Sequence, residues 1–212
     1  MKTSSSIYAL CAAALAAACT HLADPSANAP APASAAYRID NALSAIHFVT
    51  MKAGQAGAGG IGEVQRFSRF SGGMDGSGRV GFDVDLASVE TGVDIRDERL
   101  RTMLFNVKAT PLARFEAQFD PALIGSLPAN GARDVDLDGK LTLAGQTKPV
   151  LAKLRVSRVG ADLQVATRAP IVVDANQFGL KPGVEAMREV MGLNFLASAA
   201  PVTFSLVLHA AR

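Results

Sequence analysis

The sequence predicts an all-β domain whose antiparallel strands close into a barrel or pack as a sandwich. From Tyr37 onward, apolar and polar residues alternate along most segments, which is the pattern of strands with one buried face. Short glycine-containing turns separate neighbouring segments at the spacing of β-hairpins. No segment repeats the strand, helix, strand order of a parallel sheet. These observations favour consecutive antiparallel strands, and closing them into a barrel would leave no exposed edge.

Each expected strand places its apolar side chains on one face. The clearest case is residues 134–143, where apolar residues alternate with acidic and other polar ones. Gly145 and Gly160 mark tight turns between strands. Pro170 interrupts the run 162–173, so a bulge or a sheet edge is expected there. In chain order the expected strands are 44–52, 79–86, 113–119, 134–143, 148–159, 162–173 and 201–210.

Two segments have the periodicity of helices. They are residues 94–106 and residues 181–196, the second with Pro182 near its start and Gly192 where a helix would stop. The charged residues of the first segment are interpreted as a solvated helix face, with anion binding by its arginines as the alternative. These charged residues are Arg96, Asp97, Glu98, Arg99 and Arg101.

The chain divides into three parts by composition. Residues 1–19 have one early cation, Lys2, followed by an apolar stretch that is too short for a bilayer and typical of a signal peptide. The stretch ends in LAAAC, which resembles a bacterial lipoprotein cleavage box and makes Cys19 a candidate for lipidation; ordinary signal-peptidase cleavage nearby is the alternative. Residues 20–36 are rich in Ala, Pro and Ser and predict a tether. The folded domain is expected over residues 37–212.

The composition argues against several classes of function. The 212 residues are 49% hydrophobic, which is enough for one domain with a sizeable core. The net charge is +2 with both signs interspersed, so no nucleic-acid partner is expected. Both cysteines, Cys11 and Cys19, lie in the N-terminal segment, so the expected domain has no disulfide and no thiol nucleophile.

Residues 57–62 spell G-x-G-x-x-G, the fingerprint of a dinucleotide-binding turn. That fingerprint requires a preceding strand and a following helix within a parallel βαβ unit. The residues after Gly62 alternate like a strand instead. We therefore interpret this segment as a glycine-rich loop between two strands and expect no nucleotide.

The residues contain no recognisable catalytic or metal-binding arrangement. His47 and His209 lie on the polar phase of the first and last main strands, which would be neighbours in a closed barrel. Two such ligands without cysteine make a poor metal site, so solvated histidines are favoured. There is no G-x-S-x-G nucleophile elbow and no evident inward-facing polar cluster. We expect no catalytic residues, no metal, no cofactor and no enzymatic activity; a ligand-binding barrel and a plain packed barrel remain equally open.

Several motifs resemble the YceI family of bacterial envelope proteins. They are IDNALSAIHF, VDLASVETGVDIRDERLRTMLFNVKATPLARFEAQF, LDGKLTLAGQTKPV and VDANQFGL, which span roughly residues 40–209. The most specific piece runs from Thr91-Gly92 to Leu100 and continues with Leu104-Phe105 and Thr110-Pro111. The resemblance implies a closed eight-stranded antiparallel lipocalin-like barrel with one or two short helices. It also implies an apolar lumen that binds polyisoprenoid or other amphiphilic lipids.

The resemblance, combined with the strand pattern, assigns candidate residues to the lumen and to its mouth. The expected lumen residues are Ile46, Phe48, Val80, Phe82, Val84, Phe115, Phe119, Leu137, Leu141, Leu154, Val165, Phe178, Phe204 and Leu206. Those expected at the mouth are Met103, Leu104, Phe105, Met187, Met191 and Leu193. Ordinary core packing is the alternative for any single one of them.

The expected function is to bind, and to carry or store, an isoprenoid-type or other amphiphilic lipid in the bacterial envelope. The protein is expected to be exported to the periplasmic side and anchored to the membrane if Cys19 is acylated. Family members are often dimeric, so a homodimer is a further expectation. The alternative is a non-catalytic structural or interaction module with a packed barrel.

Overall fold

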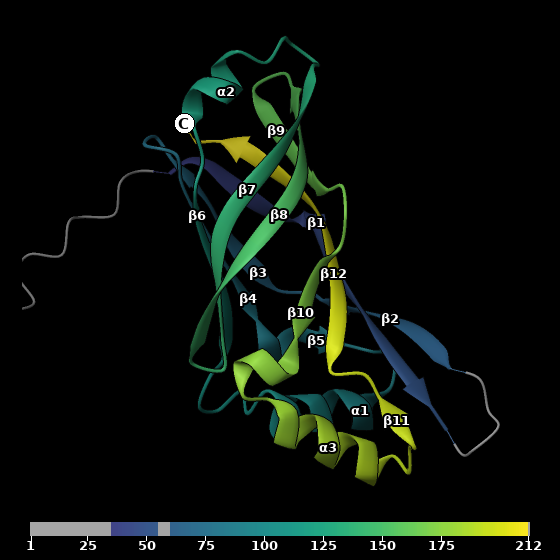
Figure 1. The fold of residues 1–212 in the computed structure, drawn as a ribbon. Helices are drawn as coiled ribbons and strands as arrows, with labels where there is room; N and C mark the ends of the chain where they lie inside the picture. Colours follow the sequence, from purple (N-terminus) through teal and green to yellow (C-terminus); the bar gives the residue numbers. More distant parts are fainter. Residues whose placement is uncertain (1–34, 55–59, 212) are drawn as a thin grey trace, which may run out of the picture. The chain divides into compact units, whose positions relative to one another are not determined.

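The structure is a computed structural model that describes residues 35–54 and 60–211 (Figure 1). The expected signal peptide with Cys19, almost all of the expected tether and the first half of the glycine fingerprint, residues 57–59, lie outside the described residues. The described residues form mostly β-strands, and every strand pairing among them is antiparallel.

Eight of the strands form a closed ring, which confirms the predicted barrel. The ring closes because the first strand pairs with the last, from Tyr37 opposite Ala210 to Phe48 opposite Val202. In order around the ring the strands are β1 (Ala35–Ala53), β3 (Phe70–Asp75), β4 (Arg79–Asp85), β6 (Leu112–Gln118), β7 (Ala132–Leu143), β8 (Gln146–Val159), β9 (Asp162–Thr167) and β12 (Ala199–Ala210).

Four shorter strands extend the wall at one end of the barrel. Three of them pair with the parts of β1 and β12 that run beyond their other neighbours, and the fourth, β5, pairs with β2. These strands are β2 (Ile61–Phe67), β5 (Val89–Glu90), β10 (Ile171–Asp174) and β11 (Phe195–Leu196). The run that was expected as one strand is divided into β9 and β10, and Pro170 lies in the gap because it has no N–H to donate to a ladder.

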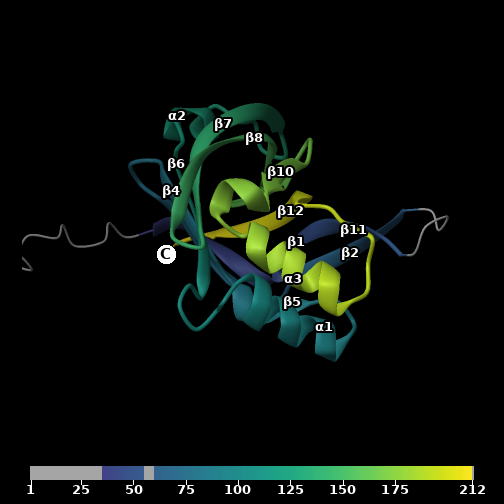
Figure 2. The same cartoon turned by 60° about the horizontal axis from the view of Figure 1, so that its bottom comes forward.

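Short helices lie at both ends of the barrel. At the end formed by the extended strands lie α1 (Asp94–Arg99) and α3 (Lys181–Val190), which face the viewer in Figure 2. The chain leaves α1 through a π-helical turn, η2 (Leu100–Leu104). At the opposite end lies α2 (Pro121–Gly125), visible at the top of Figure 1.

Helix α2 was not predicted, because five residues are too few for a helical period. Its start does carry a readable signal: Asp120 accepts a hydrogen bond from the backbone N–H of Ala122, and Pro121 follows at the first helical position. Leu86 was expected in a strand but begins the 3-10 helix η1 (Leu86–Ser88), which Asp85 caps in the same way.

Candidate ligand-binding cavity

The barrel encloses an apolar cavity of about 220 Å³, which we call the main cavity. Its walls come from the inward faces of β1, β4, β6, β10 and β12, and α1, η2 and α3 contribute at the end that they cover. A second cavity of about 70 Å³, the small cavity, lies toward α2 and is lined almost entirely by apolar side chains. The interior of the barrel therefore holds space that its own side chains do not fill.

Three phenylalanines separate the two cavities. Phe82, Phe115 and Phe204 line both of them. The ring of Phe82 lies 5.6 Å from that of Phe115 in a tilted arrangement and 6.1 Å from that of Phe204 in an edge-on one, as measured between ring centroids. Gly139 provides room for this arrangement, because a Cβ at that position would lie 2.5 Å from the Phe115 ring. We call these three residues the aromatic partition.

The structure distributes the expected lumen residues over both cavities. Phe178 lines neither, since its side chain is buried in the core beside α3. Besides the aromatic partition, the main cavity is lined by Ile46, Phe48, Val84 and Leu141, and the small cavity by Val80, Phe119, Leu137, Leu154, Val165 and Leu206.

Four of the six residues expected at a mouth form the floor of the main cavity, the end covered by α3 and η2. Met187 of α3 is only 2% exposed, and Phe105 is also buried, so neither borders solvent. Both line the main cavity together with Leu104 and Met191, whereas Met103 and Leu193 do not.

The π-helical turn explains how consecutive residues can share this floor. The backbone N–H of Phe105 donates to the carbonyl of Leu100, one residue further back than in an α-helix. The wider turn brings Leu100, Leu104 and Phe105 to the same cavity wall. Helix α3 packs closely on this turn, because a Cβ on Gly183 would lie 2.7 Å from the carbonyl oxygen of Met103.

The main cavity has a polar end that was not predicted. Thr50 and Lys52 on β1 and Glu63 and Gln65 on β2 line it, and the register places Phe48 opposite Gln65 and Thr50 opposite Glu63. The side chains of Lys52 and Glu63 are 23% and 30% exposed, so this end borders solvent. The sequence carries a signal for it: these polar residues occupy the same phase of their strands as the inward-facing Phe48.

Charged groups at this polar end are paired with one another. The Nζ atom of Lys52 lies 2.9 Å from one carboxylate oxygen of Glu63, and the guanidinium of Arg96 on α1 donates to the other. Burial works to raise the pKa of Glu63, but the hydrogen bond from Lys52 and the charge of Arg96 outweigh it and hold that pKa below its ordinary value.

Thr91 holds Arg96 in place. The Nε and Nη2 atoms of Arg96 each donate to Thr91, to its hydroxyl and its carbonyl, at 2.9 Å. The Thr91 hydroxyl and backbone N–H in turn donate to Asp97, which is 7% exposed. The interpretation of this segment as a solvated face is therefore wrong for Arg96 and Asp97, while Glu98 is exposed as expected.

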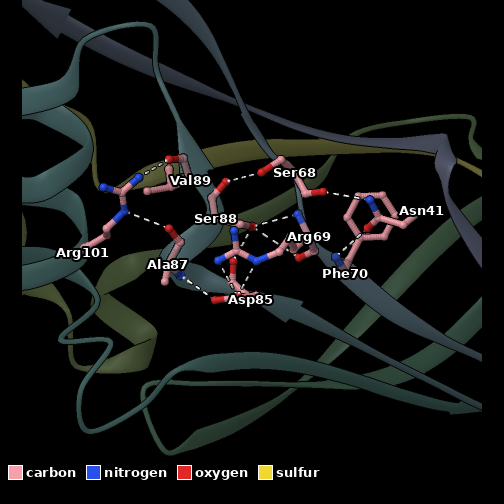
Figure 3. A network of polar contacts seen from close by, with 9 residues as sticks. All are labelled: Asn41, Ser68, Arg69, Phe70, Asp85, Ala87, Ser88, Val89 and Arg101. Atoms are coloured by element: carbon pink, nitrogen blue, oxygen red, sulfur yellow. Dashed lines mark hydrogen bonds and ion pairs between the residues drawn. The ribbon is translucent and has the colours of Figure 1, made fainter.

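A polar network attaches the segment before α1 to the barrel (Figure 3). Ser88, which is 2% exposed, accepts from the backbone N–H of Arg69 and donates to the carbonyl of Asp85. The Arg69 guanidinium donates twice to the Asp85 carboxylate, at 2.9 and 2.8 Å. Arg101 donates to the carbonyl of Ala87 at 2.8 Å and so ties the helical segment to the same loop. The network fixes the position from which α1 presents Arg96 to the cavity.

The two strand histidines do not meet. The strands β1 and β12 are neighbours as expected, but His47 pairs with Thr203, six residues along β12 from His209, a distance of about 20 Å. His209 instead lies between two aspartates, 3.0 Å from Asp40 and 2.9 Å from Asp162. The hydrogen bond with Asp162, and then that with Asp40, raises the pKa of His209 above its ordinary value.

The described residues offer no other site of the kinds considered above. Within residues 35–54 and 60–211, no cluster of three or more His, Cys, Asp or Glu side chains is arranged to hold a metal ion. Gly62 is followed by the rest of strand β2, which pairs antiparallel with β1, rather than by the helix that a dinucleotide fingerprint requires. No helix in the described part of the chain combines the length and apolarity needed to cross a bilayer.

Comparison with known proteins supports the fold and identifies the family. The YceI-like domain family matches residues 37–208. A solved structure described as a polyisoprenoid binding domain from Saccharophagus degradans, implicated in plant cell wall breakdown, is 30% identical; the match covers 84% of this chain and 99% of that chain with a TM-score of 0.78. The crystal structure of BcnA from Burkholderia cenocepacia is 20% identical over 80% of this chain and 98% of that chain, with a TM-score of 0.58. No match was found among curated proteins.

Proposed function

This chain belongs to the YceI-like domain family, as its sequence motifs indicated, and from that premise we propose that it binds an isoprenoid-type or other amphiphilic lipid in its main cavity. The observation that carries the proposal is an apolar cavity of about 220 Å³ with one polar end that borders solvent. A related structure, 30% identical over 99% of its length, is described as a polyisoprenoid binding domain, which supports this class of ligand.

The lining suits a hydrocarbon chain for a simple physical reason. Such a chain offers no polar group along its length, so its affinity comes from apolar area removed from water, at about 25 cal/mol per Å². The closed ring of strands leaves no unpaired backbone edge in the barrel wall beside the ligand. Polar residues at one end leave a place for a head group, so the cavity fits an amphiphile better than a pure hydrocarbon.

The proposed role is to carry or store this lipid on the periplasmic side of a bacterial envelope, without catalysing a reaction on it. Export follows from the signal-peptide pattern of residues 1–19, and membrane attachment would follow from acylation of Cys19. Incorporation of labelled palmitate into the wild-type protein, and its loss in Cys19→Ser, would test the anchor. Release of the wild-type protein from the membrane by salt alone would count against an acyl anchor.

Native mass spectrometry of the protein purified from its own envelope, with organic extraction of bound material, tests the binding function. We expect a discrete added mass that extracts as a prenyl or similar lipid. A clean unliganded mass, with the fold intact and no uptake of added polyprenyl compounds, would reject lipid binding. Recovery of one stoichiometric protein partner without lipid would favour the alternative of a structural or interaction module.

A further inference from the structure

Gln65 lines the main cavity and carries a buried polar atom without a hydrogen-bond partner. Its side chain is 2% exposed and lines the cavity, but its Oε1 atom has no hydrogen-bond partner. Among the described side chains that are not exposed, this is the only buried nitrogen or oxygen atom without a partner. Buried polar groups are nearly always hydrogen-bonded, so an exception beside a cavity points to a group that a ligand would satisfy.

The other edge of the Gln65 amide is occupied by Thr50. The Nε2 atom of Gln65 donates to the Thr50 hydroxyl at 3.3 Å. The free atom of the amide is the Oε1 acceptor, to which a hydroxyl can donate and an ether oxygen cannot.

The charges near Gln65 already balance one another. Two cations, Lys52 and Arg96, share the carboxylate of Glu63, and Asp97 accepts from the Thr91 hydroxyl to which Arg96 donates. An anionic head group would have to leave water without an uncompensated cation to receive it, which is strongly unfavourable. A neutral head group meets no such penalty.

We propose that Gln65 binds the hydroxyl of a neutral isoprenoid-type alcohol, which makes it the head-group residue of the main cavity. This inference rests on the proposed function and names the head group of its ligand. The apolar chain would then extend from Gln65 along the cavity toward the aromatic partition, since Gln65 and the partition both line the same cavity.

Three probes with the same hydrocarbon chain separate the contributions: geranylgeraniol, its O-methyl ether and its monophosphate. Their dissociation constants are measured by competition with a fluorescent fatty acid on the wild-type protein and on Gln65→Met, which keeps the length of the side chain without its amide. For the wild type we expect the alcohol to bind about fivefold more tightly than the ether, equivalent to about 1 kcal/mol for one net hydrogen bond. The phosphate should bind at least about tenfold more weakly than the alcohol.

In Gln65→Met the alcohol should weaken about fivefold to the level of the ether, while the ether stays unchanged. The unliganded variant should melt at a higher temperature than the wild type, because an unsatisfied buried amide has been removed. Thr50→Val serves as a second variant if Gln65→Met fails to fold, and it should weaken the alcohol but not the ether.

The outcomes distinguish the two proposals. Equal affinities of alcohol and ether for the wild type, or an equal loss of both in Gln65→Met, would overturn the role of Gln65 and leave lipid binding standing. Tightest binding of the phosphate would replace the neutral head group with an anionic one. Failure of all three probes to bind the folded wild type would instead reject the proposed function itself.

Discussion

Replacing Phe82 with alanine should lengthen the hydrocarbon chain that the protein accepts. The ring of Phe82 lies between the main and small cavities and contacts the rings of Phe115 and Phe204. Without it the two cavities join, which adds the 70 Å³ of the small cavity to the 220 Å³ of the main one and the volume of the lost ring besides. The available space therefore grows by at least about a third.

The size of the effect follows from burial. Each additional CH₂ group buried contributes about 0.8 kcal/mol, so even partial burial of one more five-carbon isoprene unit should strengthen binding at least about tenfold. The variant should lose about 3 kcal/mol of unfolding free energy, the lower end of the range for Phe→Ala, because Phe82 is only partly buried and already faces space on both sides.

The assay is a series of prenyl alcohols of increasing length, with dissociation constants measured for the wild type, for Phe82→Ala and for Phe119→Ala. Phe119 lines only the small cavity, so its removal enlarges that cavity without opening the partition and should leave the preferred length unchanged. Phe82→Leu provides a milder opening if the alanine variant is too unstable. An unchanged preferred length in a folded Phe82 variant would refute the role of the aromatic partition.

Two further predictions concern stability. Because the pKa of His209 is raised, its contribution to folding stability is fully present below about pH 6.5, the ordinary pKa, and is lost as pH rises through the pKa of the folded protein. The melting temperatures of wild type and His209→Gln should therefore differ at about pH 5.5 and converge near pH 9. A difference that stays constant with pH would contradict the pairing of His209 with the two aspartates. Gly183→Ala should destabilise the protein by roughly 1–3 kcal/mol in urea unfolding, since the new Cβ would crowd the carbonyl of Met103 and push α3 away from the cavity floor. Gly125→Ala is the matched control, because a Cβ there meets nothing within 4 Å, and equal losses in the two variants would show that packing at Gly183 is not the cause.

Alternation of residues predicts which side chains of a strand share a face, because the period of a strand leaves only two faces. Thirteen of the expected lumen residues line one cavity or the other; Phe178 does not, because it lies in the 3-10 helix η3 (Ala175–Phe178), to which a two-residue period does not apply. The division into two cavities was not predictable. The division depends on how Phe82, Phe115 and Phe204, which come from three strands, pack against one another. The pairing register of those strands determines that packing.

The polar end was missed for a different reason. Gln65 and Glu63 lie on the inward phase of β2, whereas a polar residue in an alternating strand ordinarily indicates the outer face. Only the pairing of β2 with β1 shows that these residues face Thr50 and Lys52 across a cavity. Arg96 could not be assigned either, because its position depends on contacts with Thr91 and Glu63 that lie outside its own helix.

The pairing of β1 with β12 also determines when the cavity comes into existence. The partners in this ladder are separated by nearly the whole length of the domain, so the ring cannot close until the last residues of the chain are available. Contacts between residues so far apart in sequence form slowly, because the entropy of closing a long loop opposes them. A partly synthesised chain therefore has no enclosed lumen, and a lipid can be loaded only after the final strand has joined the first.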